Sequence, residues 1–414
     1  MWIVVIWSLA CLVAINHWVC RDLRYPPFIM STLWLAVLSF YYAAPYTSHT
    51  VGPVTAAIFV VTVTSFALGG WLALQWSGGW VHGRSILAHR DQPSVRPQIR
   101  KWLLIASVLL FPLLLLKAQR LADLSGVDNF LMGLRMELLA QGSSGFGLIG
   151  NVTVLSFFTT CLYAVECDAG AAERFQYLLS LVLSLTCAAL TTGRLAIYFI
   201  LIAILSISWM RGRLSIRKVI GGAVTFLVAF GILSVALSKG GDVDASMQDN
   251  VAVIGESLVP YISGSLPAFD RLVRTDAPMT YGRNTFGDVI NFVYRVTGQQ
   301  QLMLIPEDVY VPYPTNVYTA FRPLYLDFGI GGLAAGYMLL GALSTYIFCR
   351  AVNGDRLFIL YYGFALIPLS LVSVGDQYFV PFLTWVKFGA LGYLYFRTGR
   401  AVVCGMVSAP SKGF

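Results

Sequence analysis

The sequence predicts an all-α polytopic membrane protein with about eleven transmembrane helices and one large, partly helical loop. Of the 414 residues, 57% are hydrophobic and only 12% are charged, whereas soluble domains carry about 25% charged residues. That deficit excludes a water-soluble core for most of the chain. Apolar runs of membrane-spanning length recur from end to end, and one polar segment, residues 239–322, interrupts them.

Each predicted span is an apolar run close to the length of about 20 residues that a membrane-crossing helix needs. The runs divide the chain into residues 1–238 with eight spans, the loop 239–322, and residues 323–414 with three spans and a cytoplasmic tail. The predicted spans are 2–20, 27–46, 52–76, 102–118, 147–165, 176–191, 195–210, 219–238, 324–349, 357–374 and 379–396.

The positive charges predict the orientation of these helices. Most of the 28 Lys and Arg residues fall in loops that a cytoplasmic C-terminus would place inside. The short loops on the other side hold only Lys117, Arg120, Arg135 and Arg194. Because Lys and Arg are enriched in cytoplasmic loops, the N-terminus and residues 239–322 are expected outside. The net charge of +8 is explained by this topology, and no nucleic-acid partner is expected.

Two segments on the outer side have helical patterns but do not look like spans. Residues 119–141 carry apolar residues at three- and four-residue spacing, with polar residues between them, which suits a helix lying in the membrane interface. Residues 246–274 have a similar apolar stripe, and Pro260 and Pro267 break it. The large loop is therefore expected to be partly helical.

Several arginines lie outside the predicted cytoplasmic loops. Arg194 stands between two apolar runs, Arg283 follows Tyr281 and Gly282, and Arg322 directly precedes a span. A guanidinium group can bind phosphate through two parallel hydrogen bonds, so a phosphate-bearing lipid is one interpretation. Arg271, Arg274 and Arg295 complete this set of arginines. The other interpretation is that some of them only set the membrane topology or lie in a solvated loop.

Asp327 is the most unusual carboxylate on the outer side, because it sits in the apolar sequence Tyr-Leu-Asp-Phe-Gly. A buried carboxylate needs a partner. It could act as a general base, or it could pair with Arg322 or Arg194, and pairing is the favoured interpretation. Asp376, in the short sequence Gly-Asp-Gln-Tyr, is explained by turn formation, since Gly and Asp both favour turns.

Tyrosines are dense in the outer part of the chain, and Tyr281 and Tyr318 are among them. Aromatic belts at a membrane interface explain much of this density, and stacking on sugar faces is the alternative. None of the seven cysteines and four histidines lies within residues 239–322. A disulfide framework in that loop is therefore excluded, and no metal site is predicted.

Local motifs add to this layout. They are Thr192-Gly193-Arg194 at a helix start, the stretch from Tyr261 to Phe269 with Asp270, and Asn316-Val317-Tyr318-Thr319 followed by Tyr325-Leu326-Asp327-Phe328-Gly329 and Gly332. Together with many spans and one large loop late in the chain, these motifs resemble the Wzy-type O-antigen polymerases, a family of bacterial polysaccharide repeat-unit polymerases.

The resemblance implies a glycosyltransferase in the bacterial inner membrane whose large periplasmic loop carries the active site. Its substrates would be undecaprenyl-diphosphate-linked oligosaccharides, and the growing chain would be moved onto a new lipid-linked repeat unit. No cofactor and no metal would be needed. Membrane lipid would surround the protein, and a chain-length regulator is a possible partner.

The resemblance also implies roles for individual residues. Arg194, Arg283 and Arg322 would bind the substrate diphosphate, and arginines can stabilise the negative charge that develops on such a leaving group. Asp327 or Glu256 could take the proton of the acceptor hydroxyl. The sugar contacts are assigned to Tyr281, Asn316 and Tyr318.

Two other functions stay open at this point. The first is an O-antigen ligase, although ligases typically carry a histidine in the large loop and this loop has none. The second is a flippase or transporter for a lipid-linked substrate. Transporters usually show repeated halves and broken helices at the midplane, and neither is evident in the sequence.

Overall fold

The structure is a computed structural model of the whole chain, and it describes most of it. The described residues are 2–43, 50–77, 96–141, 145–166, 170–215, 217–218, 221–222, 264–275, 278–302, 309–311 and 314–407. Arg194, Pro314 and residues 398–407 are described by their backbone alone.

The protein is an all-α polytopic membrane protein, as the sequence predicts. Within the described residues, six helices are long and apolar enough to cross a membrane, and two shorter apolar helices accompany them. Ten of the eleven predicted spans coincide with described helices, and the span predicted at 219–238 lies almost wholly outside the described residues. The helices divide between two compact units.

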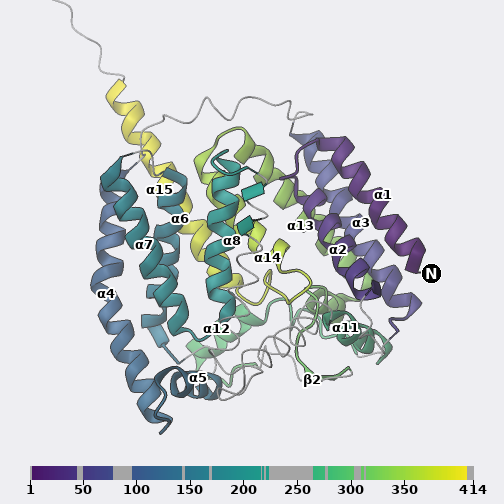
Figure 1. Cartoon of the computed structure of the whole chain (residues 1–414), viewed down its shortest axis with the longest axis horizontal. Helices are drawn as coiled ribbons and strands as arrows, with labels where there is room; N and C mark the ends of the chain where they lie inside the picture. Colours follow the sequence, from purple (N-terminus) through teal and green to yellow (C-terminus); the bar gives the residue numbers. More distant parts are fainter. Residues whose placement is uncertain are drawn as a thin grey trace, which may run out of the picture. The chain divides into compact units, whose positions relative to one another are not determined.

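The first unit comprises residues 1–84, 240–353 and 365–385. Its long helices lie side by side in Figure 1. Two short helices and a two-stranded antiparallel pair come from the polar segment that precedes α13, with Val309 opposite Thr315. The elements are α1 (Trp2–Cys20), α2 (Pro26–Ala43), α3 (Pro53–Trp76), α11 (Ser265–Arg274), α12 (Gly287–Thr297), β1 (Val309–Tyr310), β2 (Pro314–Thr315) and α13 (Arg322–Val352).

Glycines allow α3 and α13 to pack closely, and among the described helices this pair has the most extensive contact. A Cβ atom on Gly69 would lie 1.8 Å from the Met338 carbonyl oxygen, and a Cβ on Gly341 would lie 2.0 Å from that of Phe66. Small residues that let two backbones approach are typical of helix association in membranes. The contact fixes α13, whose first two turns carry the predicted site residues Arg322 and Asp327.

A cluster of buried aromatic rings connects α11 to the long helices. Phe269 of α11 lies 5.9 Å from Phe59 of α3 and 6.1 Å from Phe321 at the start of α13, between ring centroids. Trp34 of α2 packs against both Phe59 and Phe321, at 4.7 and 4.9 Å. All four rings are fully buried. The polar segment is thereby joined to the same core as three of the long helices.

The second unit comprises residues 85–239, 354–364 and 386–414. Figure 1 shows its helices α4, α6, α7 and α8 as neighbours. The last two helices of the chain, α14 and α15, contribute residues to both units. The elements are α4 (Pro97–Leu124), α5 (Phe130–Gln141), the 3₁₀ helix η3 (Gly147–Gly150), α6 (Asn151–Glu166), α7 (Ala171–Leu190), α8 (Arg194–Met210), α14 (Arg356–Ser370) and α15 (Phe382–Val407).

A buried ionic network joins four helices of the second unit. The Arg100 guanidinium of α4 contacts Glu166 of α6 at 3.4 Å and Glu173 of α7 at 2.7 Å, and Arg100 and Glu166 are fully buried. The Tyr395 hydroxyl of α15 donates to Glu166 at 2.7 Å. Because an unpaired buried charge is strongly destabilising, these partners are needed together.

The segment 119–141, which the sequence predicts as an interfacial helix, contributes to two helices. Residues up to Leu124 continue α4, and α5 is a separate helix that packs against α4. Leu121 and Leu134 are both buried in the resulting core. Gly133 permits the contact, since a Cβ there would lie 2.4 Å from Ser125 Oγ and 2.9 Å from the Ala122 carbonyl oxygen.

The glycine contact between α3 and α13 makes a first prediction. Gly341→Ala places a methyl group against the Phe66 carbonyl, and overpacking of this kind costs about 1–3 kcal/mol. Gly331→Ala in the same helix is the matched control, because a Cβ there has no neighbour within 4 Å. We expect Gly341→Ala alone to lower the thermal unfolding midpoint in detergent. Equal unfolding midpoints for the two variants would show that Gly341 is not required for the close packing of α3 and α13.

Candidate functional site

The candidate site is built around a break near the start of α13. Gly329 has φ of 64° and ψ of −161°, so the backbone leaves helical geometry there. A side chain at this position would be strained. Beside the break, the Leu326 carbonyl accepts a hydrogen bond from the Thr280 backbone N–H at 3.0 Å. The segment 278–286 is thereby docked onto α13.

Asp327 holds this segment in place. Its side chain is fully buried. The carboxylate accepts hydrogen bonds from the Thr280 hydroxyl, from the Asn284 backbone N–H at 3.1 Å and side-chain amide at 3.0 Å, and from the Thr285 backbone N–H at 2.6 Å. Both carboxylate oxygens are engaged. The loop Thr280–Thr285 therefore wraps around a single buried charge.

The loop presents two of the predicted site residues to the exterior. Tyr281 and Gly282 have φ of 46° and 94°, and the left-handed region is uncommon for a bulky residue such as tyrosine. The Tyr281 side chain is 81% exposed. Arg283 is exposed as well. Their backbone is fixed by Asp327 while their side chains stay accessible, an arrangement that suits ligand binding.

The partners of Asp327 bear on the two roles that the sequence left open. Among the described residues they are hydroxyl, amide and backbone N–H donors, not the arginine that the sequence favoured. Donors of this kind favour the ionised carboxylate and occupy its lone pairs. A carboxylate so engaged is a poor proton acceptor, and we infer that Asp327 positions the loop.

A second group of residues lies at the first turn of α13. Arg322 is its first residue, and its guanidinium carbon lies 5.2 Å from the centroid of the Tyr318 ring, which is cation–π geometry. The Ala320 backbone N–H donates to the Val372 carbonyl at 2.9 Å. Asn316, which follows β2, is exposed. The structure thus places Arg322 with Tyr318 and leaves Asn316 accessible two residues away.

The turn after α14 contributes a further carboxylate. Asp376 Oδ1 accepts from the backbone N–H groups of Tyr378 and Phe379, at 2.9 and 3.1 Å, which is the turn geometry expected from the sequence. Its buried Oδ2 has no hydrogen-bond partner among the described residues. Burial raises the pKa of Asp376 to about 6, although the N–H groups of residues 378–380 and Arg322 act in the opposite direction.

The structure does not test two of the predicted site residues. Arg194 is the first residue of α8 in the second unit, and its side chain lies outside the described part of the chain. Glu256 also lies outside the described residues. Both assignments stay predictions.

The structure gives Asp270 a role that sequence reasoning missed. Its fully buried carboxylate accepts from the Gly52 backbone N–H and the Thr55 hydroxyl at the start of α3, both at 2.7 Å. It also pairs with Arg274 at 2.7 Å. Arg274 and Arg271 further donate to the carbonyls of Thr50 and Tyr310, each at 2.9 Å. These arginines therefore hold the polar segment to its neighbours. The partners of Asp270 on α3 are over 200 residues away, so no local pattern could reveal them.

The Asp327 contacts make a second prediction. Asp327→Asn keeps one acceptor oxygen and replaces the other by an NH2 donor, so some of the loop's donors lose their acceptor, and each unsatisfied group costs about 1–3 kcal/mol. The loop should then open more often. We expect trypsin to cleave the full-length protein in detergent after Arg283 about tenfold faster or more in this variant. Cleavage after Arg295 in α12 is the internal control. Unchanged cleavage after Arg283 would show that the carboxylate does not hold the loop.

The pKa of Asp376 makes a third prediction. Because the folded-state pKa of about 6 lies above the ordinary value of 3.8, the folded protein keeps a proton that the unfolded chain has lost. Stability should therefore fall as pH rises from about 4 to about 7. Asp376→Asn keeps the Oδ1 acceptor but cannot ionise. Its unfolding midpoint relative to wild type should rise with pH across this window. Parallel pH profiles of the two proteins would show that the pKa of Asp376 is not raised in the folded state.

The fold and the site define a polytopic helical membrane protein in which arginine and tyrosine side chains are exposed beside a buried carboxylate. A family model described as "Putative O-antigen polymerase" matches residues 23–375 of the chain. The protein therefore belongs to the O-antigen polymerase family, which confirms the resemblance found in the sequence. No curated protein and no solved structure matches it significantly.

Membership of this family gives the general activity. The protein is a glycosyl-transferring enzyme of polysaccharide biosynthesis that acts on lipid-linked oligosaccharide repeat units in a membrane. The matched region includes Arg194, Arg283, Arg322 and Asp327, and it ends one residue before Asp376.

Proposed function

We propose that this protein joins undecaprenyl-diphosphate-linked repeat units at the periplasmic face of the bacterial inner membrane. It moves the growing chain from its carrier onto a new lipid-linked unit. The distribution of Lys and Arg supports a periplasmic position for residues 239–322. A chain-length regulator stays a predicted partner.

The observation that carries the proposal is the loop that Asp327 holds on α13. It fixes the backbone of Arg283 and leaves the guanidinium exposed, while Arg322 stands at the first turn of the same helix. Two cations held by one helix end suit a diphosphate, which carries its charge on two neighbouring groups. Arg194 is the third predicted ligand of this diphosphate.

The proposed reaction is a displacement at the anomeric carbon of the growing chain. A hydroxyl oxygen of the new unit forms a bond to that carbon, and the bond from the carbon to the diphosphate oxygen breaks. The diphosphate leaves on its lipid carrier, and the arginines stabilise its negative charge without a metal ion. Tyr281, Tyr318 and Asn316 hold the sugars, so that the hydroxyl and the anomeric carbon meet in one orientation.

A base must take the proton of the acceptor hydroxyl. We assign Asp327 a positioning role because its oxygens are engaged by donors. Asp376 is the better candidate in the described part of the chain, since its Oδ2 has no hydrogen-bond partner there and Arg322 acts on it. Glu256 stays a predicted alternative.

The function is tested by deleting the gene in a strain that attaches its polymer to a surface glycolipid. We expect a single repeat unit in place of a ladder, because only unit-to-unit transfer is blocked. A ligase deletion would leave no attached sugar and would accumulate long lipid-linked chains. A flippase deletion would trap single units on the cytoplasmic face. Either of these outcomes would overturn the proposal.

The same strain tests the arginines by complementation. Arg283→Ala should restore no ladder at a normal protein level, and Arg283→Lys should restore it poorly, because lysine lacks the planar pair of donors. Arg295→Ala is the matched control, an exposed arginine of α12 outside the proposed site. A normal ladder with Arg283→Lys would show that the two parallel donors of a guanidinium group are not required at this position.

A further inference from the structure

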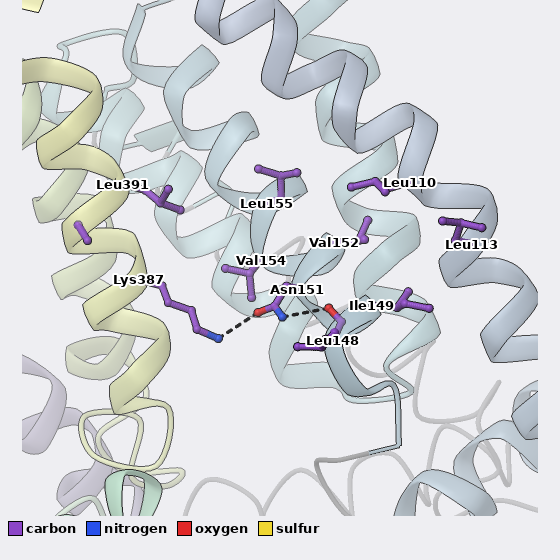
Figure 2. Close-up of a pocket in the computed structure, with 11 residues that line it drawn as sticks. Leu110, Leu113, Leu148, Ile149, Asn151, Val152, Val154, Leu155, Lys387 and Leu391 are labelled. Atoms are coloured by element: carbon purple, nitrogen blue, oxygen red, sulfur yellow. Dashed lines mark hydrogen bonds between the residues drawn. The ribbon is translucent and has the colours of Figure 1, made fainter. Parts of the chain in front are cut away.

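The second unit contains an apolar groove apart from the residues discussed so far. Its cavity of about 600 Å³ lies between α4, the start of α6 and α15 (Figure 2). Leu110 and Leu113 of α4 form one wall, and Leu155 and Leu391 stand on the other two helices. Leu113 is 50% exposed, so the groove opens at the protein surface.

The polar side chains that line the groove are Lys387 and Asn151, and they lie together. The Lys387 ammonium donates to Asn151 Oδ1 at 3.0 Å, and the Asn151 amide donates to the Leu148 carbonyl at 3.0 Å. Figure 2 shows both hydrogen bonds at one end of the groove. Asn151 therefore holds the lysine cation at this end.

The helices give the groove a direction. Asn151 is the first residue of α6, and Lys387 lies near the start of α15. Leu155 and Leu391 follow four residues later on their helices, which is about 6 Å further along the axis. The groove thus has a cation close to the helix ends and hydrocarbon beyond it. This polarity matches an amphiphile with an anionic head and an apolar chain.

Apart from Lys387 and Asn151, the residues that line the cavity are apolar. A polyisoprenoid phosphate carries a single chain directly on its phosphate, whereas a phospholipid carries two chains on a glycerol. A lysine is a suitable ligand for a phosphate group at the boundary of the hydrocarbon layer.

We propose that this groove binds a polyisoprenoid phosphate, with isoprenoid units along the leucines and the phosphate on Lys387, as a lipid site separate from the arginines that bind the substrate diphosphate. The choice of a polyisoprenoid rests on the proposed function, because that reaction uses such a carrier. The helix ends at Lys387 and Asn151 would then lie on the periplasmic side, where the carrier's phosphate stands.

Binding of undecaprenyl phosphate to the purified full-length protein tests the proposal without turnover. Loss of a charge-assisted contact costs about 1.5–3 kcal/mol, so Lys387→Gln should weaken binding about tenfold or more. Lys387→Arg should stay close to wild type. Ala390→Trp should weaken binding by filling the groove, since Ala390 is an exposed lining residue. Lys117→Gln in α4 is the matched control, a lysine outside the lining.

Two outcomes would overturn the proposal. Unchanged binding by both Lys387→Gln and Ala390→Trp would show that the lipid binds elsewhere. Equal competition by phosphatidylglycerol would show a general anionic-lipid site instead of a carrier site. The result is independent of the surface ladder, so failure of the groove and failure of the polymerase function are distinguishable. Elution of each variant as a monodisperse peak confirms that it is folded.

Discussion

The buried carboxylate of Asp327 is the interaction on which the candidate site depends. A charge in an apolar helix is tolerated only where donors surround it. Here the donors come from one short loop, so hydrogen bonds from that loop offset the cost of burying the charge and at the same time order the loop. The order extends to Arg283, which lies between two of the donating residues. An exposed cation with a fixed backbone loses less conformational entropy when it binds an anion.

The rest of the first unit supports this arrangement from two sides. Phe269 packs in the same aromatic cluster as Phe321, the residue that precedes α13. The neighbouring Asp270 accepts hydrogen bonds from the Gly52 backbone N–H and the Thr55 hydroxyl at the start of α3. The polar segment is thus held by one ring and one carboxylate that are adjacent in sequence. α3 in turn packs against α13 through their glycine contact, and α13 is the helix that carries Asp327.

The helices could be predicted from the sequence, and the partners of the charged residues could not. Runs of apolar residues give the spans because lipid demands continuous apolar helices. The packing of α5 escaped prediction because it depends on the space at Gly133. Asp327 was recognised from its apolar setting, but its donors are more than 40 residues earlier in the chain. Tyr281 and Arg283 were predicted from residue type, and the loop conformation that exposes them was not.

The most direct measurement is reconstitution of the purified full-length protein with lipid-linked repeat units in vesicles. The account predicts lipid-linked dimers and longer chains, with one diphosphate carrier released for each new glycosidic bond. It also predicts that a chelator of divalent ions leaves the rate unchanged, because arginines stabilise the leaving group. Absence of any product longer than one unit would contradict the assignment of glycosyl transfer to this chain. A strict requirement for a divalent ion would contradict the role of the arginines.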